Sequence, residues 1–289
     1  MIINIKKNKL LIFGNGYSTK YLIKKAKNYF NSISVATRSI PSLKLKNINY
    51  INFYDVKEVS KILENSIIIS TVPPNHKNED PVLKVYKNYF KRYNSAFGYI
   101  SSTSVYGRGT IFEDTKVNPN SKRGMIRVNV EKEWKKYCKS IKIFRSGGIY
   151  GINRHPMLSY LKGNIEIAVK PEHYTNRVHV QDLANIILYA LSKSVSSEVI
   201  NVVDPNPSIG FEAIRFVANS LQLRDPIPVH YRKANLSEMR KSFFETSKIV
   251  RSSVINKKFK YDFLYPYYAE SLLLITRKFL KNNKKKHFK

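Results

Sequence analysis

Short apolar runs rich in β-branched residues alternate along the chain with segments whose apolar residues recur every three or four positions. The runs predict strands, and the periodic segments predict the helices that connect them. This alternation is typical of an α/β fold, a Rossmann-type doubly wound parallel sheet with helices on both faces. The predicted strands are 10–13, 32–37, 48–51, 67–72, 98–102, 141–145 and 199–203, and the predicted helices are 17–30, 80–93, 127–140 and 180–191.

The alternation ends in two proline-containing regions, 152–176 and 205–280. We expect them to form a small C-terminal substrate lobe over the carboxyl ends of the strands, where ligands of open α/β sheets bind. The Rossmann core then comprises about residues 8–151 and 177–204, and residues 281–289 form a basic tail. The chain is thus expected to be a single unit of two parts.

A glycine turn follows the first predicted strand, with Gly14, Asn15, Gly16 and Tyr17 leading into a helix. A tight turn at Gly14 and the missing side chain at Gly16 allow a pyrophosphate to approach the amides of the helix N-terminus. Thr19 stands where the usual spacing has a third glycine. The motif predicts a dinucleotide site, and an ordinary strand-to-helix turn is the alternative.

Arg38 follows the second predicted strand, at the position where an NAD-binding protein places an acidic residue for the ribose hydroxyls. An arginine between two hydroxyl residues suits a 2′-phosphate instead, so we expect NADP, with NAD as the alternative cofactor. A plain surface arginine is the other interpretation of Arg38. Asp55 is a candidate contact of the adenine, and Thr71 and Val72 are candidates to line the cofactor site.

Three longer motifs carry a family resemblance: Ser-Ser-Thr-Ser-Val-Tyr-Gly at 101–107, Arg-Ser-Gly-Gly-Ile-Tyr-Gly at 145–151 and Arg-Val-His-Val-Gln-Asp-Leu-Ala at 177–184. Through them the chain resembles the extended short-chain dehydrogenase/reductases, over residues 10 to about 266. The resemblance implies a nicotinamide cofactor. It also implies that Ser102 takes the place of the catalytic Ser/Thr, which hydrogen-bonds the substrate oxygen.

The family's catalytic Tyr-x-x-x-Lys pair is absent, because Arg123 and Arg127 occupy those positions. This variant resembles an atypical subgroup of bacterial NAD(P)-dependent epimerase/dehydratase-like proteins. Arginine neither gives nor accepts a proton near neutral pH, so it cannot replace the tyrosine. Arg127 is expected to hold the ribose hydroxyls or the nicotinamide phosphate, as the lysine does, and Arg123 to bind an anionic substrate group or a developing oxyanion.

Proton transfer, where it occurs, needs another side chain. Tyr106, Tyr150 and His179 are the candidates, and a packing or capping role is the favoured interpretation of each. Glu131 and Glu133, on the predicted helix that follows Arg127, are expected to be solvated acids.

Composition limits the remaining classes of protein. With 289 residues and 43% hydrophobic content, the chain can bury a full core without cross-links. Cys138 is the only cysteine, which excludes an intramolecular disulfide and a cysteine-based zinc site, and we expect no bound metal. No apolar stretch has the length of a bilayer span and no secretory signal is evident, so a cytoplasmic location is expected.

The net charge of +31 suggests nucleic acid as a binding partner. The basic residues are spread along the chain, and the 37 lysines outnumber the 14 arginines, which argues against a dedicated binding face. Residues 277–289 form the one basic cluster, which we interpret as a solvated tail. Nucleic acid is therefore not the expected partner.

Two functions fit these observations. The first is an NADP-dependent oxidoreductase or epimerase that acts on a carbonyl or alcohol of a small or nucleotide-linked sugar substrate. The alternative is a non-catalytic NADP(H)-binding sensor or scaffold, since the catalytic pair is replaced. Whether identical chains associate is left open by the sequence.

Overall fold

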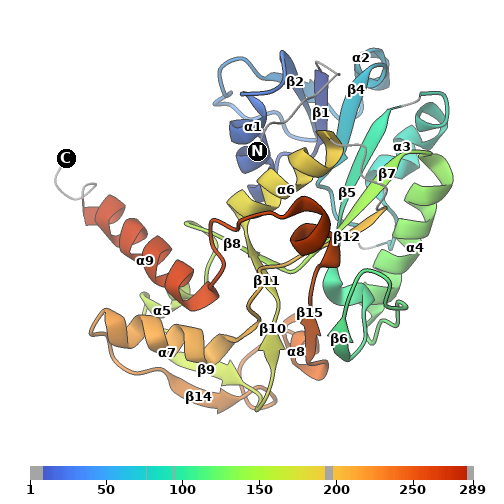
Figure 1. The fold of residues 1–289 in the computed structure, drawn as a ribbon. Helices are drawn as coiled ribbons and strands as arrows, with labels where there is room; N and C mark the ends of the chain where they lie inside the picture. Colours follow the sequence, from blue (N-terminus) through green and yellow to red (C-terminus); the bar gives the residue numbers. More distant parts are fainter. Residues whose placement is uncertain (1–8, 76, 94, 193–197, 285–289) are drawn as a thin grey trace.

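The computed structural model describes residues 9–75, 77–93, 95–192 and 198–284. Seven parallel strands form the central sheet in the order β12-β7-β5-β4-β1-β2-β3 (Figure 1). Every predicted strand is present, with ends within two residues of the prediction, so the doubly wound α/β fold is confirmed. The strands are β1 (Lys9–Phe13), β2 (Ser32–Thr37), β3 (Asn49–Asn52), β4 (Ser66–Ser70), β5 (Ala96–Ser102), β7 (Ile141–Ser146) and β12 (Val199–Val202).

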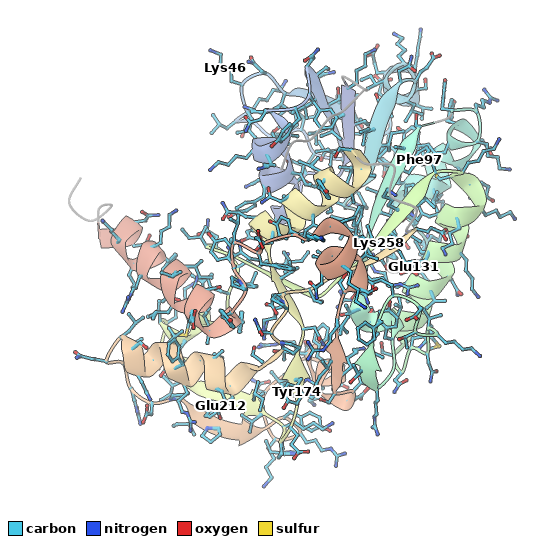
Figure 2. All side chains as sticks on the ribbon, in the orientation of Figure 1. Lys46, Phe97, Glu131, Tyr174, Glu212 and Lys258 are labelled. Atoms are coloured by element: carbon cyan, nitrogen blue, oxygen red, sulfur yellow. The ribbon has the colours of Figure 1, made fainter. Side chains whose placement is uncertain are left out.

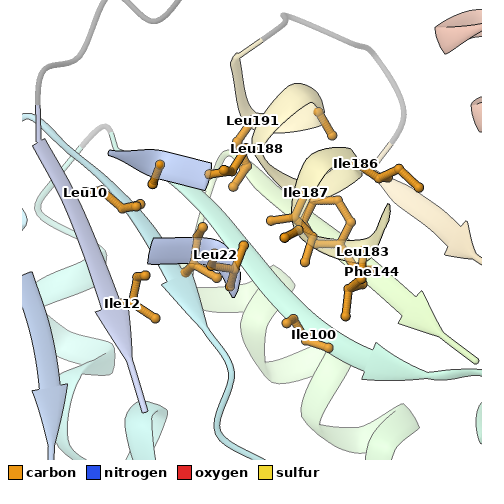
Figure 3. Packing of buried hydrophobic residues seen from close by; sticks show 14 of the residues in the cluster. Leu10, Ile12, Leu22, Ile100, Phe144, Leu183, Ile186, Ile187, Leu188 and Leu191 are labelled. Atoms are coloured by element: carbon orange, nitrogen blue, oxygen red, sulfur yellow. The ribbon is translucent and has the colours of Figure 1, made fainter. Parts of the chain in front are cut away.

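Helices cover both faces of this sheet. Leu10 and Ile12 of β1 point to the face covered by α1 (Tyr17–Ala26) and α6 (Val180–Ser192), and Figure 3 shows Leu22 close to them and Leu183 farther across the same face, beside Phe144. Side chains alternate along a strand, so Leu11 and Phe13 point to the opposite face. That face is covered by α2 (Val56–Leu63), α3 (Pro81–Phe90) and α4 (Lys122–Tyr137). Burial on both sides explains why these strands are almost continuously apolar.

The second part of the molecule has its own apolar cluster. It joins α5 (Met157–Tyr160), α7 (Gly210–Ser220) and α9 (Tyr268–Lys284), which lie apart from the sheet in Figure 1. Helix α9 includes the first four residues of the predicted basic tail, and residues 285–289 lie outside the described residues. Short strand pairs complete this lobe: β9 (Glu166–Val169) with β14 (Ile227–His230), and β10 (Tyr174–Thr175) with β13 (Ser208–Ile209).

Several segments connect the lobe to the core. Strand β8 (Gly148–Tyr150) pairs with β11 (Arg177–His179), and β6 (Gly109–Ile111) pairs with β15 (Lys248–Val250). After β15 the π-helix η2 (Val254–Phe259) packs into the α1–α6 side of the core. The predicted lobe range 205–280 therefore contains a segment that returns to the core. The remaining elements are the 3-10 helix η1 (Thr103–Val105) and α8 (Glu238–Glu245).

Asp182 fixes the returning chain to α6. Its carboxylate is fully buried and accepts hydrogen bonds from the Tyr261 hydroxyl at 2.7 Å and from the backbone amides of Leu264 and Tyr265 at 2.9 and 3.1 Å. Burial raises the pKa of this carboxyl, and these three donors oppose the rise. The aspartate of the third family motif thus joins segments about eighty residues apart in the sequence.

A buried ion pair attaches α4 to the sheet. Glu131, labelled on α4 in Figure 2, accepts from the Arg145 guanidinium of β7 at 2.6 Å and from the Ser101 hydroxyl of β5 at 2.6 Å. Arg145 also donates to the Tyr106 hydroxyl, which donates in turn to Asn201 of β12. The expectation that Glu131 is solvated is wrong, because Arg145 compensates its charge inside the protein; Glu133 is exposed as expected.

We predict that Glu131→Gln destabilises the fold by about 3–5 kcal/mol, because it leaves the Arg145 guanidinium buried without a counter-charge. Urea unfolding followed by circular dichroism measures this change. Glu212→Gln is the matched control, since Glu212 forms an exposed ion pair with Arg215, and exposed pairs contribute little. Equal urea midpoints for the two variants would show that the buried ion pair contributes no more to stability than the exposed one.

Candidate functional site

The glycine turn after β1 is packed against the end of β4. Gly14 has a φ of +97°, and a Cβ added there would lie 2.7 Å from the Thr71 hydroxyl oxygen and 3.0 Å from a Val72 methyl carbon. Both the backbone conformation and the space therefore require glycine. The Gly14 amide donates to the carbonyl of Ala36 on β2 at 2.9 Å, so the turn is attached to both neighbouring strands.

Thr19 takes part in this turn in a way that the sequence analysis missed. Its hydroxyl donates to the Gly14 carbonyl at 2.9 Å and lies 3.1 Å from the Thr71 hydroxyl. Thr71 in turn donates to the carbonyl of Phe13. A fully buried threonine thus replaces the third glycine and locks the turn. The only sign of this role in the sequence is that Thr19 stands where the motif usually has a glycine.

The N-terminus of α1 fits an anionic ligand. Gly16 is the N-cap and supplies no side-chain hydrogen bond, the first turn contains no acidic residue, and no atom lies within 4 Å of an added Cβ at Gly16. Asn15 and Tyr17 flank this opening and are half-buried. The first amides of the helix are consequently left without a side-chain acceptor, as a bound diphosphate requires.

Two further cofactor candidates lie at the ends of neighbouring strands. Arg38 is exposed directly after β2. Asp55 follows β3 and caps α2, where its carboxylate accepts from the Glu58 amide at 3.0 Å. Its observed role is thus helix capping, and contact with an adenine stays a prediction.

Helix α4 brings the two unusual arginines together. It begins at Lys122, five residues before the predicted start, with the Ser121 hydroxyl accepting from the Gly124 amide. Arg123 and Arg127 are therefore one turn apart on a single helix. An N-cap serine was the signal that could have revealed this start. A Cβ at Gly124 would collide with the Ser104 carbonyl oxygen, so this glycine allows α4 to approach the end of β5.

The two arginines have different surroundings. Arg127 is buried, and one guanidinium nitrogen donates to the Tyr99 hydroxyl at 2.6 Å and to the Ile100 carbonyl at 3.0 Å. Arg123 reaches solvent and stacks over the ring of Phe243, with 5.5 Å between the guanidinium carbon and the ring centroid. Burial lowers the pKa of Arg123, and the nearby charges of Arg127 and Arg154 lower it further.

Ser102 is the last residue of β5 and is half-buried. Its hydroxyl oxygen accepts from the Ser104 amide at 3.2 Å, which leaves the hydroxyl proton available for another acceptor. The carboxyl end of β5, the glycine turn and the N-terminal half of α4 thus come from separate parts of the sequence to one end of the sheet (Figure 1).

The three candidates for proton transfer are all buried. The Tyr106 hydroxyl already donates to Asn201 and accepts from Arg145, each at 2.8 Å. Tyr150 and His179 form an aromatic group in which their ring centroids lie 5.2 Å apart. Burial lowers the pKa of His179 to about 4, so its imidazole is neutral at pH 7. These surroundings favour the packing role for Tyr106 and His179.

Two negative findings concern the described ranges alone. No helix in them is long and apolar enough to cross a membrane. Within the same residues, no group of three or more His, Cys, Asp or Glu side chains could hold a metal ion.

Comparison with known proteins identifies the fold. No protein-family model and no curated protein matches the chain. Among solved structures, a functionally unknown conserved protein from Silicibacter pomeroyi is 25% identical with a TM-score of 0.84, over 94% of this chain and 99% of that one. A Bacillus cereus UDP-N-acetylglucosamine 4-epimerase is 16% identical with a TM-score of 0.71, over 94% and 99%.

A third match is the human epimerase family protein SDR39U1, solved with NADPH, at 15% identity and a TM-score of 0.70 over 93% of this chain and 99% of that one. The chain therefore has the fold of the NAD(P)-binding epimerase/dehydratase proteins. The expected epimerase/dehydratase-like fold is confirmed, and the match spans both the core and the lobe.

We predict that Gly14→Ala weakens the fold more than Gly163→Ala. Both residues have positive φ values, +97° and +93°, but no atom lies within 4 Å of an added Cβ at Gly163. The Gly163 variant pays only the conformational cost of about 1–2 kcal/mol, whereas the Gly14 variant must also displace Thr71. Urea unfolding of both variants tests this, and equal losses of stability would contradict the tight packing of the turn.

Proposed function

We propose that the chain is an NADP-dependent oxidoreductase or epimerase that acts on a carbonyl or alcohol of a small or nucleotide-linked sugar substrate. The observation that carries the proposal is the uncapped N-terminus of α1 beside the glycine turn, at the same end of the sheet as Ser102. Two proteins that share the fold support the proposal: the UDP-N-acetylglucosamine 4-epimerase supports a nucleotide-linked sugar as substrate, and the protein solved with NADPH supports the cofactor.

The cofactor contacts follow from the geometry of the turn. The amides after Gly14, Asn15, Gly16 and Tyr17 would hold the diphosphate, and Thr71 with Val72 would form the adjacent wall. Arg38 is exposed with its guanidinium free to reach a 2′-phosphate, and this supports NADP over NAD. A nicotinamide cofactor held in this way would supply or accept a hydride.

The reacting group of the substrate belongs beside Ser102. The serine hydroxyl would donate a hydrogen bond to the substrate oxygen, and Arg127, whose position is fixed by Tyr99 and Ile100, would hold the ribose of the cofactor. Because no tyrosine stands at position 123, this side of the site offers fixed positive charge in place of a movable proton. Stabilisation of a developing oxyanion is therefore the catalytic contribution we assign to Ser102.

The replacement of the tyrosine and lysine also favours a second candidate, a non-catalytic NADP(H)-binding sensor or scaffold. Such a protein needs the turn and Arg38 but no proton donor. The surroundings of Tyr106 and His179 support this alternative, because the Tyr106 hydroxyl is already bound to Asn201 and Arg145 and the His179 imidazole is neutral at pH 7.

We predict that Arg38→Gln lowers the affinity for NADP by about 10–100-fold, the loss expected for hydrogen bonds to a charged group. Affinity for NAD should stay unchanged, because NAD lacks the 2′-phosphate. Isothermal titration calorimetry with both nucleotides measures the two constants. Arg92→Gln, at another exposed arginine, is the control for the change in net charge. Equal effects on NADP and NAD would contradict the role of Arg38.

We predict turnover when the protein is incubated with NADPH and a panel of carbonyl compounds and nucleotide-linked sugars. Ser102→Ala should lower kcat by about 10²–10³-fold, as expected for the loss of one oxyanion donor, and Ser102→Thr should retain activity. NADPH binding by fluorescence should be the same in all three proteins. Tight NADPH binding without turnover on any compound would reject the enzyme and support the sensor.

A further inference from the structure

Three lysines from two helices surround the ring of Tyr137, the last residue of α4. The Nζ atoms of Lys87, Lys91 and Lys136 lie 5.7, 4.9 and 5.7 Å from the centroid of this ring. Lys87 is in the last turn of α3, Lys91 caps the C-terminus of α3, and Lys136 is in the last turn of α4. We call these three residues the lysine cluster. The fold thus gathers in one place basic residues that the sequence distributes over separate segments.

The two helices that carry the lysine cluster are packed against each other. The buried rings of Phe90 on α3 and Trp134 on α4 stack with their centroids 5.6 Å apart. The Trp134 indole also donates to the carboxylate of Asp80, the residue that caps α3. The core therefore holds the backbones of the three lysines together.

The charge of the lysine cluster is not neutralised by an ion pair. In the ranges that the structure describes, no carboxylate lies within ion-pair distance of its three ammonium groups. The nearby carboxylate of Glu198 binds Lys135 instead, at 3.0 Å. The face of an aromatic ring and the C-terminal ends of helices attract cations. Both effects hold the ammonium groups near Tyr137 without removing their charge, which stays available to an anion from solution.

The surface around the lysine cluster offers charge but no large apolar anchor. None of the exposed large apolar side chains of the described residues belongs to α3 or to the second half of α4. Protein partners bind mainly through apolar and aromatic anchors, and helices that lie on membranes insert apolar side chains. A nucleic acid needs neither, because its phosphates bind lysines by releasing counterions.

The lysine cluster lies at the opposite end of the sheet from the proposed cofactor site. Helices α3 and α4 end shortly before β5 and β7 begin, whereas the glycine turn and Ser102 lie at the carboxyl ends of β1 and β5 (Figure 1). The strands are parallel, so these are the two opposite ends of the sheet. A ligand on the lysine cluster therefore leaves the cofactor site free.

We propose that the lysine cluster binds the phosphate backbone of a nucleic acid, independently of base sequence. Lysine ammonium groups are compact point charges that suit phosphates. The spread of basic residues along the sequence argued against such a partner, and their gathering around Tyr137 removes that argument. This binding goes beyond the proposed function and does not depend on it, because the two sites are separate.

Fluorescence anisotropy of a labelled single-stranded oligouridylate, measured over a range of salt concentrations, tests the proposal. A triple variant with Lys87→Gln, Lys91→Gln and Lys136→Gln should bind about tenfold or more weakly. The slope of log affinity against log salt should become shallower by about 2, because three phosphate contacts are lost. Lys91→Gln alone, at the lysine closest to the ring, should make the slope shallower by about 0.7.

The matched control loses the same amount of charge at exposed lysines on separate elements, namely α2, the segment after β14 and α9. It combines Lys57→Gln, Lys233→Gln and Lys278→Gln. This control should bind nearly as tightly as the native protein, and saturating NADP should leave oligonucleotide binding unchanged. Both triple variants should keep the native circular dichroism, because exposed lysines contribute little to stability.

Four results would overturn the proposal. The first is that the native protein does not bind the oligonucleotide even at low salt. The second is an equal loss of affinity in both triple variants, which would show that binding follows the net charge of +31 and no particular face. The third is displacement of the oligonucleotide by NADP. The fourth is a labelled oligoglutamate that binds at least as tightly and loses affinity only in the cluster variant, which would assign the lysine cluster to an acidic protein.

Discussion

The ion pair between Glu131 and Arg145 is the contact on which the arrangement of the site depends. It joins α4 to β7, while Ser101 of β5 and, through Tyr106, Asn201 of β12 bind to the same two charges. A buried pair of this kind tolerates no loss of one partner, because the remaining charge cannot be solvated. The orientation of α4 relative to three strands is thereby defined, and the arginines at its beginning inherit that orientation.

Arg123 and Arg127 stand where the family resemblance implies the catalytic pair, and the surrounding structure accommodates them. Gly124 still permits the close contact between α4 and the backbone of Ser104, and Ser102 still ends β5. What differs is that Arg127 is tied to Tyr99 and Ile100 while Arg123 faces outward against Phe243. Both side chains carry a permanent positive charge, because arginine stays protonated near neutral pH.

The strands of the sheet could be predicted because each is buried on both faces and therefore consists largely of apolar residues. Helix α2 escaped prediction since it has only eight residues, of which Val59 and Leu63 are buried. The burial of Glu131 could not be predicted either. In the sequence a buried glutamate looks like a solvated one, and only the fold shows that Arg145 lies beside it. The glycine turn and the position of Ser102 were visible in the sequence as motifs. The hydrogen bond from the Thr19 hydroxyl to the Gly14 carbonyl and the contact of Arg154 with the Tyr17 ring are seen only in the folded chain.

The path of the chain between its two parts has a consequence for how the molecule is assembled. The polypeptide enters the lobe after β8, returns at β11, leaves again after β12, comes back through β15 and η2, and ends in α9 within the lobe cluster. No single cut separates the two parts, so neither of them consists of one continuous segment of the chain. The α1–α6 side of the core includes apolar residues of η2, so this side is fully covered only after η2 has been synthesised.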